Sequence, residues 1–529
     1  MGDSDINELW NRFQNEMDTT IVGVTMGILV LFVLVRLALP DTVPYIITDV
    51  RTGLLNTFGP VFLTLMVVFV LFCTAIIIGP WGSIRLGGPD ATPSYTFPAY
   101  FAMFFSAGIA AGIVFWGPAE ALFHYNTVPP FVDAAAGSSA AATGALKTVL
   151  FHWGISAWSA YVAVGVPIAY YAYNKGAPLR VSTLLTPFLG TDNLDSPLAK
   201  LVDVLAVFAT IGGVATSVGF VGNQFLSGVS YQWGVQTTNL DTLLVVGGIT
   251  VIFTVSVVTG VKRGIRRIAA VNFGLFLVLG LVTLIVGPTL YIIANGSVAF
   301  VGYAVEFISL SFAPLLGDGG GGWYNAWTLF YWVWWFSWAP FAGLFLAAIS
   351  KGRTLRTVAT TGVFATSLAT IVWFAIIGGT SLHLQAEGIA DIAGVMGESG
   401  YAVAAFPLFD ALPVGGLLVF LFMALIITFL VTSADTSTLT ISILATEQGV
   451  APTMPTRVFW GVLQGAFGAG LIIVGGGPAL QSAAVITGGP FGVIAFVGVA
   501  GLVKDFYSTD VEGKTVVTAV NDAINSRGD

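Results

Sequence analysis

The sequence predicts an all-α polytopic membrane protein with twelve transmembrane helices, and three observations predict it. Of 529 residues, 56% are hydrophobic and only 9% are charged, with a mean hydropathy of +0.89. Apolar runs of about 18 or more residues, long enough to cross a bilayer as helices, recur from end to end. Six of the fourteen tryptophans gather within Trp323–Trp338, a density that no soluble core needs.

We expect each apolar run to form one crossing. The runs are residues 20–39, 58–79, 98–119, 149–173, 203–232, 241–260, 268–294, 327–349, 358–379, 413–445, 457–475 and 481–503. The 413–445 run exceeds one bilayer crossing, so we expect it to tilt or to continue beyond the membrane.

The basic residues predict the orientation. With a cytoplasmic N-terminus and twelve crossings, sixteen of the nineteen Lys and Arg residues fall in cytoplasmic segments. Because positive charge accumulates on the cytoplasmic side, we expect a multi-pass protein of the cell membrane with both termini in the cytoplasm. The net charge of −8 excludes nucleic acid as a plausible partner. The apolar runs make the lipid bilayer the expected surroundings.

Two spans contain residues that break helices within the apolar region. The third carries Gly108, Gly112 and the pair Gly117-Pro118, and the eighth carries Pro340 and Gly343. They stand five spans apart, as the first helices of two five-span repeats would. Paired interrupted helices point to a transport site at the membrane midplane, whereas the alternative is small residues that allow close helix packing.

The eighth span carries a stripe of aromatic side chains. At about 100° per residue, one face collects Trp327, Tyr331, Trp334 and Trp338, with Trp335 at its edge. Quaternary ammonium groups are held by aromatic faces rather than by salt bridges. The stripe therefore predicts a site for an organic cation.

A second aromatic group lies in the fourth span. Trp153, Trp158 and Tyr161 fall within an arc of about 140° when projected on one helix. Alone, such a group is more often core packing or an interfacial belt. If it faces the stripe of the eighth span, the two complete a box around a cationic headgroup.

Hydroxyl groups in the tenth span suggest an ion site. Phe429, Thr432 and Ser433 share one helical face, and the hydroxyls are hard oxygen donors that suit sodium alongside carbonyls of a broken helix. The alternative is hydroxyls bonded to their own helix. Asp435 is an intramembrane carboxylate, either functional or paired with a basic residue, and Thr210 in the fifth span is a further oxygen donor.

No catalytic constellation is present in the sequence. Cys73 is the lone cysteine, and His124, His152 and His383 lie too far apart in sequence for metal-ligand spacing. His152 has no partner that the sequence makes evident and is better explained as a buried, hydrogen-bonded histidine, and Glu120 is as readily explained by packing or capping as by function. We therefore expect neither an enzyme nor a transition metal site.

These segments resemble the betaine/choline/carnitine transporter (BCCT) family over nearly all spans. The similar motifs are WGSIRLGG (81–88), GPAEALF (117–123), HWGISAWSAY (152–161), GVKRGIRRI (260–268), the eighth-span stretch 327–354 and FLVTSAD (429–435). The resemblance implies a LeuT-type fold with two inverted five-helix repeats, spans 3–7 and 8–12, after two extra N-terminal spans. It also implies a homotrimer.

The predicted organisation follows from this resemblance and from the runs. The segments are an acidic N-terminus (1–19), two extra spans (20–97), a first repeat (98–294), a loop with an amphipathic interfacial helix (295–326), a second repeat (327–503) and a cytoplasmic tail (504–529).

The resemblance also implies site residues. The substrate site would comprise Trp153, Trp158, Tyr161 and Trp335 as the trimethylammonium box, Trp334 and Trp338 along the path, and Gly108, Ile109 and Gly112 of the third span. One sodium site would combine backbone at Ala107 and Ile109 with Phe429, Thr432 and Ser433. A second would involve Thr210 and Phe341, but Val214 stands where sodium-coupled members have threonine.

The third span also bears on the substrate. Betaine carriers typically read Gly-Met-Gly-Ile-Gly where this chain has Gly108-Ile109-Ala110-Ala111-Gly112, and choline carriers tend to end this segment with aspartate. A neutral residue at position 112 does not repel a zwitterion's carboxylate, which favours betaine. The carnitine exchangers' fixed arginine in the fifth span is absent from this sequence.

The predicted function is sodium-coupled import of glycine betaine or a related trimethylammonium osmolyte by alternating access, with no other cofactor. One alternative is proton-coupled uptake or exchange of choline or carnitine. Another is a receptor that binds the ligand without transport, against which stands the lack of a soluble output domain in the sequence.

Overall fold

A computed structural model of the chain describes residue 11 and residues 13–259, 261–315 and 321–508. Most of both predicted terminal segments lies outside these residues, as do the side chains at 109–111, 239, 259, 261–265 and 474–476. The described chain is helical throughout its regular structure, which confirms the all-α prediction.

The helices follow the apolar runs. Their bounds are α2 Thr19–Ala38, α3 Val43–Ile78, α4 Phe97–Asn126, α5 Ser139–Trp153, α6 Ile155–Asn174, α7 Thr186–Leu189, α8 Pro197–Trp233, α9 Asn239–Thr259, α10 Val261–Val286, α11 Thr289–Phe312, α12 Gly321–Ala326, α13 Thr328–Ile349, α14 Leu355–Ala359, α15 Thr366–Ala386, α16 Ile392–Ser399, α17 Ala405–Asp410, α18 Gly415–Leu444 and α19 Met454–Tyr507. A π-helical turn, Thr360–Ala365, joins α14 to α15.

One predicted boundary is wrong. The seventh run was expected to extend over 268–294, but α10 ends at Val286 and the following residues begin α11. Pro288 explains the break, because proline offers no N–H to a continuing helix and disfavours helical backbone in the residue before it. The last two predicted runs fall within α19, whose candidate spans are Met454–Ile473 and Gly477–Tyr507.

Twelve described helical segments are long and apolar enough to cross a membrane, and bent α4 makes thirteen. Contacts between loops reduce this number. Arg85, after α3, donates through Nη1 to the carbonyl oxygen of Gly352, after α13, at 2.6 Å, so both loops lie at one end of the molecule. Six candidate spans other than α11 lie between the two loops in the sequence, and an even number of crossings returns the chain to the same end. A crossing by α11 would make seven and would place the loops at opposite ends. The number of crossing spans is therefore twelve.

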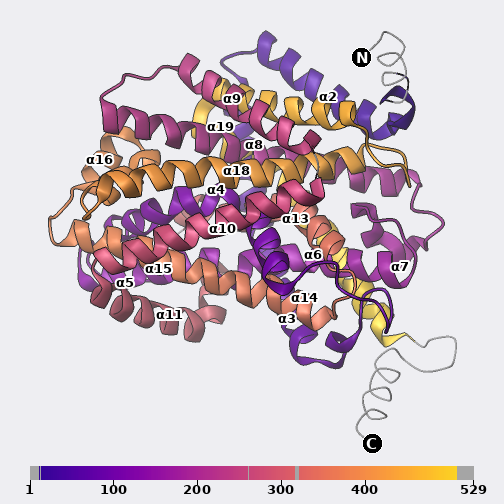
Figure 1. Cartoon of the computed structure of the whole chain (residues 1–529), viewed down its shortest axis with the longest axis horizontal. Coiled ribbons are helices and arrows are strands. Elements are labelled where there is room, and N and C mark those ends of the chain that lie inside the picture. The colour runs from indigo at the N-terminus through magenta and orange to yellow at the C-terminus, as the bar shows by residue number, and fades with distance from the viewer. Residues whose placement is uncertain (1–10, 12, 260, 316–320, 509–529) are drawn as a thin grey trace, which may run out of the picture.

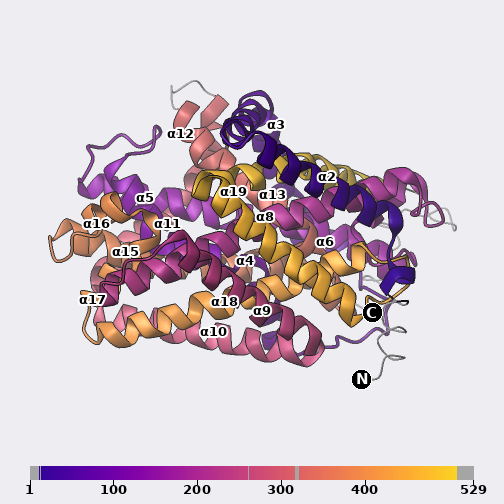
Figure 2. The same ribbon diagram turned by 90° about the horizontal axis from the view of Figure 1, so that it is seen from above.

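The packing repeats with an offset of five spans. In the first half, α4 packs against α15 and α18 of the second; in the second half, α13 packs against α6 and α8 of the first. Helix α18 lies beside α10 along the front of the molecule (Figures 1 and 2). Because five is odd, a second group of five crossings must run in the opposite direction to the first, as an inverted repeat requires.

The expected interruption at Pro340 is not seen. Helix α13 continues through Pro340 to Ile349. Close packing explains why position 343 is a glycine, because a Cβ atom there would lie 2.7 Å from the Cβ of Val164. The close approach of α6 supports α13 beyond the proline, so the packing alternative holds for Gly343.

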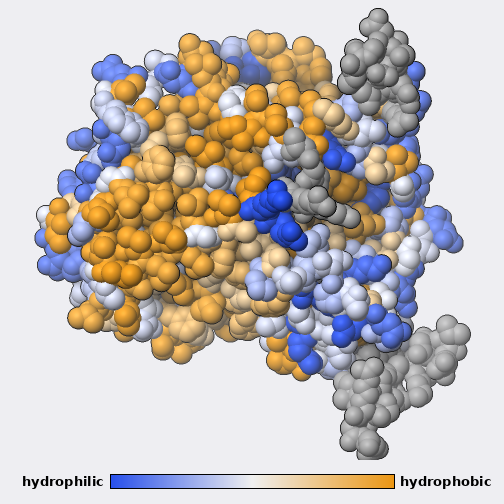
Figure 3. All heavy atoms as spheres, in the orientation of Figure 1, coloured by the Kyte–Doolittle hydropathy of each residue, from blue (hydrophilic) through white to orange (hydrophobic). Residues whose placement is uncertain are grey.

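The outer surface matches a bilayer environment. Figure 3 shows hydrophobic side chains covering most of the visible face, with hydrophilic ones gathered toward its ends. Large apolar side chains exposed on single helices include Leu37 of α2 at 74% and Val305 of α11 at 79%. In a membrane such side chains contact lipid rather than water.

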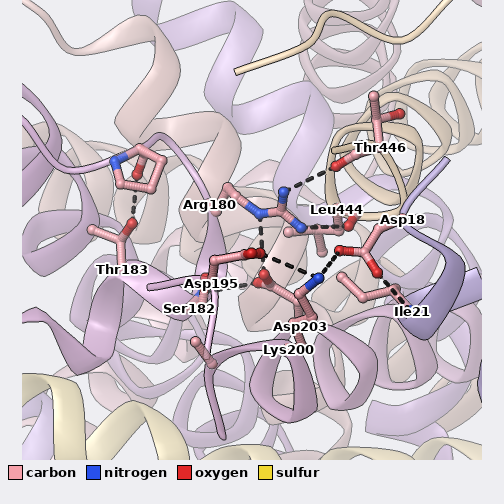
Figure 4. Close-up of polar contacts among 12 residues, drawn as sticks. Asp18, Ile21, Arg180, Ser182, Thr183, Asp195, Lys200, Asp203, Leu444 and Thr446 are labelled. Atoms are coloured by element: carbon pink, nitrogen blue, oxygen red, sulfur yellow. Dashed lines mark hydrogen bonds and ion pairs between the residues drawn. The ribbon is translucent and has the colours of Figure 1, made fainter. Parts of the chain in front are cut away.

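One end of the molecule, here called the basic end, carries Arg85, Arg180, Lys200 and Arg353. There Arg180 donates to the carboxylate of Asp203 at 3.1 Å and to the carbonyl oxygens of Leu444 and Thr446 (Figure 4). Leu444 is the last residue of α18, and Thr446 follows it. Lys200 pairs with Asp18 at 2.9 Å and with Asp195 at 3.2 Å. These contacts join the start of α2, the start of α8 and the end of α18.

Candidate functional site

The site begins at a bend in α4. The segments Phe97–Gly108 and Gly112–Asn126 meet at 64°. A Cβ atom at Gly108 would lie 2.9 Å from Cζ3 of Trp158, and one at Gly112 would lie 2.9 Å from Cη2 of Trp153. Both glycines therefore let indole rings lie against the backbone of α4. Ile109, predicted for the substrate and sodium sites, has a side chain outside the described residues.

A second break lies in the fourth span and was not predicted. Helix α5 ends at Trp153 and α6 begins at Ile155, on either side of Gly154. The N–H of Ile155 is satisfied by the hydroxyl of Tyr303 at 3.1 Å. The projection of Trp153 and Trp158 onto one continuous helix was therefore wrong; a lone glycine was the only sequence signal for the break.

The structure nevertheless brings the predicted box together. The ring centroids of Trp153 and Trp335 lie 4.8 Å apart, those of Trp335 and Tyr161 6.4 Å, and those of Tyr161 and Trp158 5.8 Å, each edge to face. None of the four side chains is more than 1% exposed. We call these four residues the aromatic box.

Trp334 and Trp338 continue from the box along α13. Trp334 stacks on Trp335 at 5.1 Å and contacts Trp338 at 6.3 Å, and Trp338 contacts Phe341 at 5.1 Å. The indole N–H groups of Trp334 and Trp338 and the hydroxyl of Tyr161 are buried without a protein partner among the described residues. Buried polar groups without partners are costly, so these three are available to a polar ligand.

Glu120 of α4 lies behind the box and is completely buried. Its carboxylate accepts hydrogen bonds from Nε1 of Trp153 and from the hydroxyl of Tyr331, both at 2.6 Å, and lies 2.7 Å from Nδ1 of His152. His124 approaches the same carboxylate at 3.5 Å. The prediction of a buried, hydrogen-bonded His152 is confirmed, and Glu120 is the partner that the sequence did not reveal.

The same group bears on metal binding. Ligand atoms of Glu120, His124 and His152 lie within 4.8 Å of one another, close enough to hold a metal ion. The expectation that the histidines are too dispersed was wrong for His124 and His152, because sequence spacing does not report contacts between α4 and α5. Only the i, i+4 spacing of Glu120 and His124 was a signal in the sequence.

The predicted sodium-site hydroxyls lie against the bend. Ser433 of α18 donates to the carbonyl oxygen of Ala107 at 2.9 Å. Thr432 donates to its own helix at Thr428 and accepts from Nδ2 of Asn272 at 2.5 Å. Thr432 therefore bonds to its own helix, as the alternative to an ion site supposed, whereas Ser433 faces the carbonyl oxygens of α4. Asn272 of α10 was missed, because nothing in the sequence links it to α18.

The other predicted polar residues also have partners, one in its own helix and one in a neighbouring helix. Thr210 donates to the carbonyl oxygen of Ala206 in its own helix at 2.7 Å, and Val214 one turn later is buried. Buried Asp435 accepts a hydrogen bond from Ser256 of α9. The predicted second sodium site thus has one side-chain oxygen, already bonded, at Thr210.

A cavity of about 430 Å³ lies among helices that neighbour the box. Its lining includes Phe115, Trp116, Phe220, Asn223, Tyr401 and Gln481. Phe220 contacts Trp334 at a centroid distance of 6.0 Å and stacks on Phe115 at 4.7 Å. Phe220 therefore both lines this cavity and contacts Trp334, which stacks on Trp335 of the box.

A buried aromatic box at a bent membrane helix, beside a cavity, is the arrangement of a small-solute transporter. The profile described as BCCT, betaine/carnitine/choline family transporter, matches residues 20–511. The chain belongs to this family. It is a multi-pass secondary transporter of the betaine and choline type, and not an enzyme.

Characterised and uncharacterised relatives agree with this assignment. An uncharacterized transporter of Mycobacterium tuberculosis is 38% identical over 446 residues, 83% of this chain and 74% of that protein. The glycine betaine transporter OpuD of Bacillus subtilis is 34% identical over 464 residues, 88% and 89% of the two chains. An ectoine/hydroxyectoine transporter of Virgibacillus pantothenticus is 34% identical over 450 residues, 84% and 88%.

Similarity to solved structures is more distant. The crystal structure of MhsT in complex with L-phenylalanine has a TM-score of 0.47 and 13% identity, covering 81% of this chain and 96% of that chain. A likeness at this level carries no weight for the fold or function of this chain.

Proposed function

We propose that this protein imports glycine betaine, or a closely related trimethylammonium osmolyte, together with sodium. The observation that carries the proposal is the aromatic box, in which Trp153, Trp158, Tyr161 and Trp335 from three helices meet edge to face. Ring faces attract a quaternary ammonium group, and each desolvated contact contributes up to about 2 kcal/mol.

The charges around the box support a cationic headgroup. Of the helices that form the box, α6 and α13 contain no lysine or arginine, and Lys147 of α5 is paired with Glu306 at 2.6 Å. The carboxylate of Glu120 accepts a hydrogen bond from the indole of Trp153. The substrate's own carboxylate would find donors in the unpartnered N–H groups of Trp334 and Trp338 and the hydroxyl of Tyr161. A zwitterion such as betaine would use both the surroundings that suit a cation and the donors that suit a carboxylate. Choline would use the surroundings that suit a cation, and it offers those donors a hydroxyl in place of a carboxylate.

Sodium coupling is supported by the contact between α18 and the bend of α4. The Ser433 hydroxyl donates to the Ala107 carbonyl oxygen at 2.9 Å, so two hard oxygen donors face one another, and an ion would bind them by displacing this hydrogen bond and moving the oxygens apart. Hard oxygen donors of this kind suit sodium. We propose that Ala107, Ile109 and Phe429 contribute backbone oxygens and that Thr432 and Ser433 contribute hydroxyls.

The test is uptake of labelled betaine into proteoliposomes. We expect accumulation driven by an inward sodium gradient, inhibited by excess unlabelled betaine more than by choline or ectoine. Accumulation driven by a proton gradient without sodium would replace the proposal with proton-coupled uptake. Ectoine serves as the competitor because one relative transports ectoine and hydroxyectoine. Binding without accumulation would indicate a receptor.

We also propose the predicted orientation and assembly, with cytoplasmic termini and a homotrimer. The basic residues joined at the basic end support the orientation under the positive-inside rule. The trimer rests on the family resemblance. Accessibility of single cysteines introduced beside Arg180 and beside Glu398 would test the orientation, and the mass in lipid nanodiscs would test the assembly.

A further inference from the structure

We propose that Glu120 is the positioning residue of the substrate site: its carboxylate holds Trp153 and Tyr331 in the orientation that forms the aromatic box. The inference rests on the proposed function for its substrate, but the ring geometry on which it depends is measurable without substrate. Glu120 itself lines neither the box nor the cavity beside it.

One carboxylate oxygen serves two aromatic side chains. Oε2 accepts from Nε1 of Trp153 and from the hydroxyl of Tyr331, each at 2.6 Å. An indole N–H only donates, so Trp153 requires an acceptor at this position. Tyr331 in turn stacks on Trp335 at a centroid distance of 5.7 Å and lies 5.3 Å from Trp153. Oε2 therefore fixes one member of the box directly and supports another through Tyr331.

The second oxygen reaches the box through His152. Oε1 lies 2.7 Å from Nδ1 of His152, whose Nε2 lies 3.0 Å from the hydroxyl of Thr328. The carbonyl oxygen of the same histidine accepts from Nε1 of Trp335 at 3.1 Å. Both tryptophans that meet at 4.8 Å in the box are thus held by Glu120 or by its histidine partner.

The contacts join three elements whose relative placement forms the site. Glu120 lies on α4 beyond the bend, Trp153 ends α5 at the break before Gly154, and Tyr331 lies on α13. Eight residues separate Glu120 from Gly112, about 12 Å along a helix. A rigid half of α4 therefore carries both the glycine against which the Trp153 ring packs and the acceptor that holds its N–H.

A metal ion is the rival explanation for this cluster. Glu120, His124 and His152 have ligand atoms within 4.8 Å. However, Oε2 is occupied by two donors at 2.6 Å, and the separation of Oε1 from Nδ1 is that of a hydrogen bond. The donor set fits hydrogen bonding without an ion, and added zinc or chelator distinguishes the two explanations.

The conservative variant separates geometry from charge. In Glu120→Gln, the amide oxygen is able to accept from Trp153 and Tyr331 while the amide nitrogen donates to His152 in its other tautomer. Glu120→Ala removes the partner of Nε1 of Trp153, of the hydroxyl of Tyr331 and of Nδ1 of His152. Glu306→Gln is the matched control, because Glu306 pairs with Lys147 at 2.6 Å away from the box and is 43% exposed.

The experiment measures betaine and sodium dependence of uptake in proteoliposomes. We expect Glu120→Ala to raise half-saturating betaine by about tenfold or more and Glu120→Gln by less than about threefold, as loss and retention of acceptors imply. Half-saturating sodium, measured at saturating betaine, should stay within about twofold in each. Glu306→Gln should match wild type, and neither zinc nor EDTA should change betaine affinity.

A substrate-free measurement keeps the test independent of the proposed function. In protein labelled with 5-fluorotryptophan, with signals assigned by Trp153→Phe and Trp335→Phe, Glu120→Ala should shift both resonances and Glu120→Gln should largely restore them. If Glu120→Ala does not fold, Tyr331→Phe replaces it and should shift the Trp335 signal.

The outcomes that overturn the inference are distinct. Unchanged fluorine signals in a folded Glu120→Ala variant, betaine loss in Glu120→Gln equal to that in Glu120→Ala, or a betaine affinity that responds to zinc would each refute positioning by the carboxylate. If the wild type fails to transport betaine but the fluorine signals shift as expected, the proposed function fails and the positioning role stands.

Discussion

The hydroxyl of Ser433 donates to the carbonyl oxygen of Ala107 at 2.9 Å, which ties α18 to α4 at the point where α4 bends. It also lies 3.3 Å from the carbonyl oxygen of Ser106. A hydroxyl facing two carbonyl oxygens already presents three oxygens in one place. The contact therefore connects the proposed ion site to the helix that carries Gly108 and Gly112 of the proposed substrate site.

Removing both hydroxyls of α18 should weaken sodium binding. For Thr432→Ala with Ser433→Ala, we expect half-saturating sodium to rise about tenfold, equivalent to ~1.4 kcal/mol. Because coupling is reciprocal, betaine affinity should fall at fixed sodium and recover at saturating sodium. Betaine binding across a sodium series measures both effects. Ser437→Ala, which removes a hydroxyl bonded to Gln464 one turn later, is the control, and parallel curves for the double variant would refute the site.

Replacing one tryptophan of the box should remove most substrate affinity. For Trp335→Leu, loss of ~2 kcal/mol predicts about a thirtyfold weaker affinity for any trimethylammonium substrate. Trp332→Leu is the matched control, because Trp332 is equally buried but packs on Phe151 at 5.0 Å. Fluorescence titration with betaine measures the change. Equal losses in the two variants would indicate general destabilisation and not loss of the box.

Any side chain introduced at position 112 should displace the ring of Trp153 before it affects the substrate directly. Aspartate there was expected from sequence to shift preference from betaine toward choline, but any Cβ would lie 2.9 Å from Cη2 of Trp153 and 3.3 Å from Cη2 of Trp334. We expect Gly112→Ala to weaken betaine binding about tenfold, within the ~1–3 kcal/mol typical of overpacking. Gly112→Asp should displace Trp153 in the same way and weaken both substrates, with a larger loss for betaine than for choline because the new carboxylate repels the betaine carboxylate. Gly274→Ala, where a Cβ meets nothing within 4 Å, is the control; unchanged Gly112→Ala affinity contradicts the contact.

A second sodium ion should require a hydroxyl at position 214. Val214 is buried one turn from Thr210, whose hydroxyl is bonded to Ala206. We expect Val214→Thr to steepen the sodium dependence of uptake, because two oxygens on one face provide what one bonded hydroxyl lacks. Val207→Thr, also buried in α8, controls for the hydroxyl itself. A wild-type sodium curve in Val214→Thr would show that the missing threonine does not limit ion number.

The network at the basic end should contribute to stability. Arg180→Ala leaves the Asp203 carboxylate, 2% exposed, without its cation and the carbonyl oxygens of Leu444 and Thr446 without their donor. Removing one partner of a buried pair typically costs ~3–5 kcal/mol, so the thermal unfolding midpoint should fall clearly. Lys147→Ala breaks the more exposed pair with Glu306 and should cost at most ~1 kcal/mol. Equal midpoints in the two variants would contradict the network's role.

The box shows how far sequence reasoning reached. Trp153, Trp158, Tyr161 and Trp335 were predicted, and the structure places them together. The reason given for the first three was partly wrong, since α5 ends before Gly154 and the residues do not share one helix. Aromatic composition was nevertheless informative, because a cation site needs aromatic faces whichever helix carries them.

Glu120 and Asn272 show which contacts could not be predicted from the sequence. Each is a polar residue in a mainly apolar span, and sequence spacing within its helix does not say what lies opposite. Their partners, Trp153, Tyr331 and Thr432, belong to other helices. Pro340 shows the converse error, because close packing of α6 at Gly343 sustains a helix that proline would otherwise interrupt.

The sequence by itself determined the membrane environment, the number of crossing helices and the residue types of the site, because bilayer thickness sets the length of each apolar run and cations require aromatic faces. Tertiary structure alone decided that α4 bends by 64° over Gly108 and Gly112, and that Glu120 holds the indole of Trp153. Such contacts form between helices, so they depend on how the helices pack and not on the spacing of residues along any one of them.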